Sequence, residues 1–86
     1  MKLQGRIDST NAEEWEKKIM ANLPEEGAYE LDCSNLTYIS SAGIRIIISL
    51  YKILKSREDK LILKGVTDSV MEVLELTGVS EFLTFI

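Results

Sequence analysis

The sequence contains no histidine among its 86 residues. Catalysis by an imidazole, a phosphohistidine relay and histidine-ligated metal sites are therefore excluded. The single cysteine has no partner for an intrachain disulfide, and it provides too few thiolates for a zinc site built from several cysteines. We accordingly expect no metal, no cofactor and no catalytic residue, so the chain is not predicted to be an enzyme.

Basic charge and long hydrophobic runs are also scarce. Ten basic residues stand against fourteen acidic ones, a net charge of -4, whereas a nucleic-acid-binding protein normally needs a basic face. The apolar runs fall far below the ~18 residues of a membrane-spanning helix. The first residues also lack the pattern of a signal peptide. The sequence therefore predicts a soluble, cytoplasmic interaction domain with no nucleic-acid partner and no membrane insertion.

What is present is enough apolar material for one compact domain over residues 1–86, with 45% hydrophobic and 28% charged residues. Alternating side chains predict a strand at 1–7, and short apolar segments predict strands at 28–33 and 61–63 and a last short strand at 82–86. Helical periodicity predicts helices from the 8–11 segment to Pro24, over 41–56, and from Thr67 or Asp68 to Gly78. The order β-α-β-α-β-α-β predicts an α/β fold with a mixed, mainly parallel sheet.

Polar residues next to these segments predict local structure. Thr10 with Glu13, or Asn11 with Glu14, could form a capping box at the start of the first helix. Thr67 or Asp68 is predicted to cap the third helix. The polar segment 32–35 resembles a turn that ends the second strand.

The start of the central helix is the most informative segment. Ser40 and Ser41, followed by Ala42 and Gly43, precede a long apolar helix. Backbone N–H groups at a helix N-terminus favour an anion, so a phosphate on either serine would be stabilised there. Serine is also a preferred N-cap residue. The residues alone therefore leave both interpretations open, a modification site or a simple cap.

The central helix is apolar over an arc of roughly 220°, wider than one core contact requires. The stripe predicted to face the sheet consists of Ile44, Ile47, Leu50, Tyr51 and Leu54. Ile46 and Ile53 lie at one border of the arc and Ile48 at the other. Either flanking helices cover this excess, or part of it is a docking surface for another protein.

Charge is unevenly distributed along the chain. Segment 45–64 has six basic and two acidic residues, whereas the remainder has four basic and twelve acidic. This asymmetry could orient a partner.

Taken in order, four segments resemble the STAS domain, and more narrowly the bacterial anti-sigma factor antagonists. These segments are 5–12, 31–44, 63–66 and 76–79. The resemblance implies a small sheet with helices packed on one side. It also implies a function in transcription regulation by partner switching. The antagonist docks on an anti-sigma factor that is a serine kinase, a sigma factor is released, the kinase phosphorylates the antagonist, and a phosphatase resets it.

The resemblance assigns roles to particular residues. The phosphorylated residue of the family lies two positions before the glycine, which is Ser41, with Ser40 as the less favoured acceptor because it stands where the family usually has aspartate. Asp8 and Asp32 occupy positions where the family commonly has acidic residues near the same end of the sheet. The expected partner-binding residues are Asp8, Asp32, Ser40, Ser41, Ala42, Gly43, Arg45 and Ile48.

Family members usually have a further strand or hairpin before the segment 5–8, whereas only four residues precede Gly5 here. We expect an exposed sheet edge and a tendency to form homodimers.

Two alternative functions compete with the antagonist. One is an unphosphorylated STAS regulatory subunit of a transporter or signalling assembly. The other, a small enzyme with Cys33 or Ser41 as nucleophile, is disfavoured by the missing histidine and the absence of a Gly-x-Ser-x-Gly motif.

Overall fold

The computed structural model describes all residues 1–86 as an α/β domain. Its elements follow the predicted order and are β1 (Lys2–Ile7), α1 (Ala12–Ala21), β2 (Tyr29–Ile39), α2 (Ser41–Ser56), β3 (Leu61–Lys64), α3 (Asp68–Leu76), the 3-10 helix η1 (Val79–Phe82) and β4 (Thr84–Phe85). The bounds of α2 are the predicted ones. The last predicted strand is shorter than expected, because Phe82 belongs to η1 and only two residues pair with β3.

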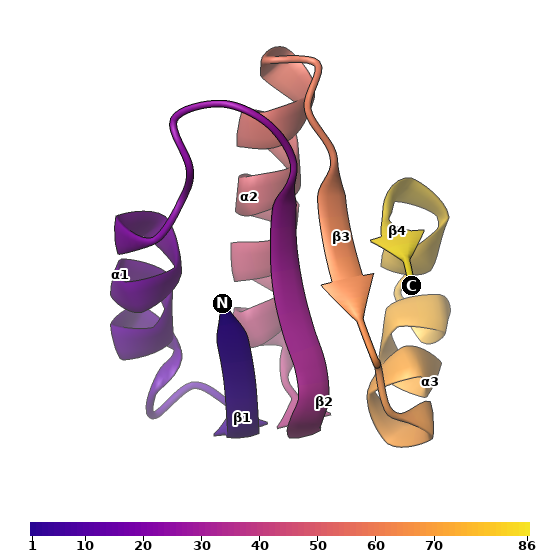
Figure 1. Cartoon of the computed structure of the whole chain (residues 1–86). Coiled ribbons are helices and arrows are strands. Elements are labelled where there is room, and N and C mark those ends of the chain that lie inside the picture. The colour runs from indigo at the N-terminus through magenta and orange to yellow at the C-terminus, as the bar shows by residue number, and fades with distance from the viewer.

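The four strands form one sheet in the order β1-β2-β3-β4. All three strand pairs are parallel, so no antiparallel strand is present. Figure 1 shows α2 running behind β2, with α1 and α3 on either side of it. Because the strands are parallel, their carboxyl ends point the same way, toward the lower end of the view, where α2 and α3 begin.

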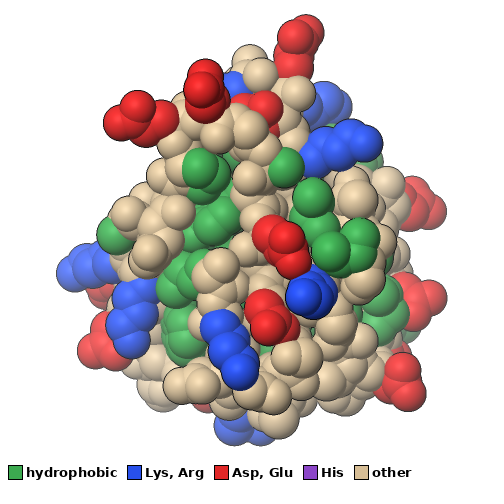
Figure 2. Space-filling view, viewed as in Figure 1, with side chains coloured by type: hydrophobic (Ala, Val, Ile, Leu, Met, Phe, Trp, Pro, Cys, Tyr) green, Lys and Arg blue, Asp and Glu red, His purple; other side chains and the backbone are tan.

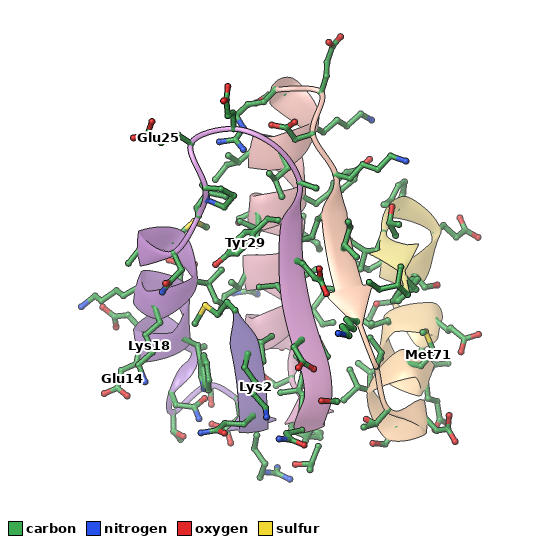
Figure 3. The ribbon with its side chains drawn as sticks, viewed as in Figure 1. Lys2, Glu14, Lys18, Glu25, Tyr29 and Met71 are labelled. Carbon is green, nitrogen blue, oxygen red and sulfur yellow. The ribbon has the colours of Figure 1, made fainter.

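The opposite face of the sheet is open. Lys2 projects from β1 on this face, whereas Tyr29 points from β2 toward α1 (Figure 3). The Tyr29 hydroxyl donates a hydrogen bond to the carbonyl of Ile19, 2.8 Å away. Acidic and basic side chains lie close together near the middle of the open face (Figure 2). Mixed charges of this kind keep a sheet face solvated, so the core lies on the helical side only.

The core consists of 18 buried apolar residues, and α2 is its central element. Leu50 and Leu54 are fully buried. The wide apolar arc of α2 is covered in part, since α1 packs against α2 and Ile46 is buried. Ile48 remains half-buried, and Ile53 is 37% exposed. Flanking elements therefore cover Ile46 but leave Ile53 at the same border exposed, and they cover Ile48 at the other border only in part.

The predicted helix caps do not form. Asn11 precedes α1, but its side chain bonds backward, donating to the carbonyl of Arg6 at 2.8 Å and accepting from the amide of Asp8 at 2.9 Å. Thr67 precedes α3, and its hydroxyl donates to the carbonyl of Leu36 at 3.1 Å. Both side chains bond to the backbone of a strand, and these bonds replace the capping contacts predicted from the local sequence.

The segment 32–35 is not a turn, contrary to expectation. Strand β2 continues through it for eleven residues, with β1 on one side and β3 on the other. Two register shifts interrupt the pairing with β1, between Lys2 and Gln4 and between Gly5 and Arg6. Gly5 has a φ of +71°, which glycine adopts without strain. The turn-favouring residues of this segment therefore give rise to irregular pairing within a long strand and not to a turn.

Strand β1 forms one edge of the sheet, and only β2 pairs with it. An unpaired edge can recruit a second chain, but bulges and charged side chains limit such pairing. Because β1 has the charged residues Lys2 and Arg6 and its pairing with β2 is interrupted by two register shifts, we expect self-association to be weak and to appear only at high protein concentration. Light scattering over a concentration series tests this, and a monomeric mass throughout would contradict it.

Candidate functional site

The carboxyl ends of β1 and β2 meet at one place. The amide of Ser40 donates to the carbonyl of Ile7 at 2.9 Å, so Asp8, which follows Ile7, lies beside the start of α2. Loops at the carboxyl edge of parallel strands are the usual position of binding sites in α/β sheets. The predicted residues Asp8, Ser40 and Ser41 are brought together here.

The two serines differ in accessibility. Ser41 is the first residue of α2 and is exposed. Ser40 lies just before the helix in an extended conformation, and its Oγ is buried with no hydrogen-bond partner. Ser40 therefore makes no capping bond through its side chain, so the simple cap does not explain the pair. Because the Ser40 Oγ is buried, only Ser41 has a hydroxyl that a partner can reach without opening the structure.

The N-terminus of α2 has no acidic residue in its first turn and no side chain that caps it. The first amide with a backbone acceptor is that of Ile44, which donates to the carbonyl of Ser40 at 2.9 Å. The amides of the first turn therefore face outward with their hydrogen-bonding capacity free. Together with the helix dipole, they favour negative charge beside Ser41.

Gly43 lets α2 start close to the strand ends. A Cβ at this position would lie 2.5 Å from Cγ1 of Ile39 and 3.0 Å from Cγ2 of Ile7. Gly43 itself is buried and Ala42 is half-buried, so both lie beneath the surface on which Ser41 is exposed. Gly43 thus acts by setting the height of the helix start above the sheet.

Arg45 and Ile48 extend the exposed surface along α2. They lie four and seven residues after Ser41, a spacing that places all three on one face of the helix. Arg45 is exposed and Ile48 is half-buried. The predicted set of Ser41, Arg45 and Ile48 therefore forms a continuous strip with a cationic and an apolar component.

Asp8 adjoins this strip and is held in one conformation. Its carboxylate accepts hydrogen bonds from the Thr10 hydroxyl at 2.6 Å and the Thr10 amide at 3.0 Å. These bonds lower the pKa of Asp8 below its ordinary value, with a smaller contribution from the Arg6 guanidinium. Asp8 is thus a fixed negative charge at neutral pH.

Asp32 does not lie beside Asp8 and Ser41, which corrects the expectation that both acidic residues are near the same end of the sheet. It lies within β2 opposite Lys2 and Lys64, seven residues before Ile39, or about 23 Å at the rise of an extended strand. Hydrogen bonds from the hydroxyl and amide of Ser34 lower its pKa. Asp32 therefore belongs to the middle of the sheet and not to the surface at the start of α2.

Sequence reasoning missed two residues beside Asp8. Arg6 and Tyr38 are paired across β1 and β2, and the Arg6 guanidinium lies over the Tyr38 ring, 4.2 Å from its centre. The same guanidinium lies 3.9 Å from the Asp8 carboxylate. Only the parallel register of β1 and β2 could have revealed this pair. The prediction of a turn at 32–35 concealed that register.

Cys33 has no features of a nucleophile. Its side chain is buried, and burial together with the nearby Asp32 carboxylate raises the pKa of the thiol to about 12. The reactive thiolate is therefore nearly absent at neutral pH. Ser41 has no hydrogen-bonded base beside it in this structure, whereas a serine nucleophile is activated by an adjacent base.

Two further features of the structure concern metals and membranes. No group of three or more acidic or cysteine side chains is arranged to hold a metal ion. None of the helices has the length and the apolar character that crossing a bilayer requires.

Comparison with known proteins gives matches over most of the chain. The model of the STAS domain family matches residues 1–86. The protein BtrV of Bordetella bronchiseptica, assigned as an anti-sigma factor antagonist, is 38% identical over 77 residues. Those residues are 88% of this chain and 66% of BtrV, so the chain spans just under two thirds of that relative. An anti-sigma-B factor antagonist of Listeria monocytogenes is 26% identical over 80 residues, which are 92% of this chain and 70% of the relative.

Proposed function

Because the chain belongs to the STAS domain family, we propose that it is a cytoplasmic anti-sigma factor antagonist switched off by phosphorylation of Ser41. In its unmodified form it docks on an anti-sigma factor that is also a serine kinase, and a sigma factor is released. The relatives assigned as antagonists support the general role. The observation that carries the switch is the exposed Ser41 at an uncapped helix N-terminus, beside Ser40, whose Oγ is buried.

The docking surface in this proposal is the strip along α2 and the loop beside it. It comprises Asp8, Ser40, Ser41, Ala42, Gly43, Arg45 and Ile48. Within it, Ser41, Arg45 and Asp8 offer polar and charged contacts and Ile48 an apolar one, whereas Gly43 and Ala42 position the helix. Asp32 lies outside this surface because of its place in the middle of β2.

Phosphorylation changes the surface without requiring the chain to refold. A phosphoserine adds about -1.5 to -2 units of charge at neutral pH. The free amides at the start of α2 and the helix dipole stabilise that charge locally. The partner, however, has to accommodate a bulky dianion at a surface it previously contacted directly. The loss of affinity arises from crowding and from charge that the partner cannot pair, and a phosphatase that removes the group restores docking.

We expect Ser41→Asp to weaken binding to the anti-sigma factor kinase encoded in the same genome by about 100-fold, the scale of an unfavourable charge at an interface. Ser41→Ala should bind as the wild type does. Isothermal titration calorimetry measures both. Ser56→Asp provides a matched control, since it places the same charge at the other end of α2.

Equal affinities of the Ser41→Asp and Ser41→Ala variants would reject the switch. If the Ser41→Asp variant binds with the affinity of the wild type, the result would instead favour the alternative function, an unphosphorylated STAS regulatory subunit of a transporter or signalling assembly.

A further inference from the structure

A groove of about 300 Å³ lies on the far side of Ile48 from Ser41, between α2 and the segment that follows α3. Five of its eight lining residues are hydrophobic. Ile48 and Tyr51 contribute from α2, and Phe82 contributes from η1. Phe82 is 60% exposed, although its ring centre lies only 5.8 Å from that of Tyr51. An aromatic side chain held against a groove but left open to solvent is typical of the anchor points of protein interfaces.

The charge at the groove has one sign on the α2 side. Lys52 and Lys55 line it, and the Lys55 ammonium lies 5.7 Å from the centre of the Tyr51 ring. Helix α2 has no acidic residue along its whole length. An apolar side chain that enters the groove from a partner would therefore be accompanied most favourably by carboxylates.

The groove continues the strip on which Ser41 lies. From Ser41 to Lys52 the helix rises about 16 Å. An interface of standard size covers roughly 800 Å² on each partner, a patch nearly 30 Å across. A partner seated over Ser41 and Arg45 therefore reaches the groove as part of the same contact.

The distance of about 16 Å between Ser41 and Lys52 also limits the electrostatic effect of a phosphate on the groove. At physiological ionic strength the Debye length is about 8 Å, so a phosphate on Ser41 has little effect on charges at Lys52 and Lys55. The groove thus has an apolar floor, a cationic rim and a location that phosphorylation leaves unchanged.

We propose that this groove is a second anchor of the anti-sigma factor, one that is independent of phosphorylation and receives an apolar or aromatic side chain flanked by carboxylates. The inference rests on the proposed function, because it takes the anti-sigma factor as the occupant. It adds that the interface has a switchable half at Ser41 and a constant half at the groove.

The test measures binding of the kinase encoded in the same genome to groove variants and to matched controls outside the groove. Phe82→Ala removes the exposed aromatic ring, and Lys52→Glu reverses a charge at the rim. Leu76→Ala removes an apolar side chain that is 80% exposed but does not line the groove. Lys60→Glu reverses a charge on the loop before β3. Thermal melting by circular dichroism confirms that each variant is folded.

We expect Phe82→Ala and Lys52→Glu each to raise the dissociation constant about tenfold, with both controls within twofold of the wild type. The factor should be the same in the Ser41→Ala and Ser41→Asp backgrounds, because distant sites act additively. The affinity of the Lys52→Glu variant should also fall less steeply with added salt.

The contrary outcomes separate the two proposals. If Ser41→Asp weakens binding and the groove variants do not, the second anchor is rejected while the switch stands. If the wild type binds no anti-sigma factor, both proposals fail together. If Phe82→Ala abolishes self-association in light scattering and leaves kinase binding intact, the occupant is a second copy of this chain, and the proposal is overturned.

Discussion

Ser41→Ala is expected to abolish phosphate transfer from the anti-sigma factor kinase, whereas Ser40→Ala leaves the transfer intact. A kinase must bring its ATP within reach of the acceptor hydroxyl. Ser41 is exposed at the first position of α2, whereas Oγ of Ser40 is buried and has no hydrogen-bond partner. The intact mass of each variant, after incubation with the kinase and ATP, gives the number of phosphates incorporated.

The Ser40→Ala variant also serves as a folding control. A buried hydroxyl without a partner costs about 1–3 kcal/mol relative to a bonded one. Its removal should therefore leave stability unchanged or increase it, so that a loss of phosphorylation in this variant could not be attributed to unfolding. Phosphate on Ser40 in the Ser41→Ala variant would contradict the assignment and would require the start of α2 to open during the reaction.

The fold is largely predictable because most elements are specified locally. Helix α2 was predicted with its observed bounds, since a long apolar period follows two serines and a glycine. Strand β2 was predicted too short because the segment 32–35 has the composition of a turn. Its extended form depends on β1 and β3, which pair with it from both sides. Pairing between segments distant in sequence overrides local preference, and periodicity within one segment does not reveal it.

The site is predictable to a lesser extent. The sequence and its family resemblance indicate Ser41, but the burial of the Ser40 Oγ depends on the tertiary structure, in which the Ser40 amide bonds to Ile7, more than thirty residues away in the sequence. Asp32 was misplaced for the same reason, because its position depends on the register of β2. The groove was missed because Phe82 was assigned to the last strand, whereas it belongs to a 3-10 helix that packs on α2.

Gly43→Ala should destabilise the domain and weaken docking together. The added methyl would meet Cγ1 of Ile39 at 2.5 Å, a separation that forces α2 or the Ile39 side chain to move. Overpacking of this kind costs about 1–3 kcal/mol, and the better helix propensity of alanine returns up to about 1 kcal/mol. When the full return is subtracted, the net loss is up to about 2 kcal/mol, which corresponds to a melting temperature lower by up to roughly 16 °C in a domain of this size.

The Gly43 prediction is specific because its main cause is the contact with Ile39, closer than the one with Ile7, and a double-mutant cycle isolates it. Ile39→Ala removes the carbon that the new methyl would meet, at the cost of a cavity. In that background Gly43→Ala should be neutral or stabilising, because the methyl then occupies vacated space. Ser49→Ala, at an exposed position of the same helix, should leave the melting temperature unchanged. If Gly43→Ala raises the stability of the wild-type chain, helix propensity outweighs packing. The close approach of α2 to the strand ends would then not be what positions Ser41.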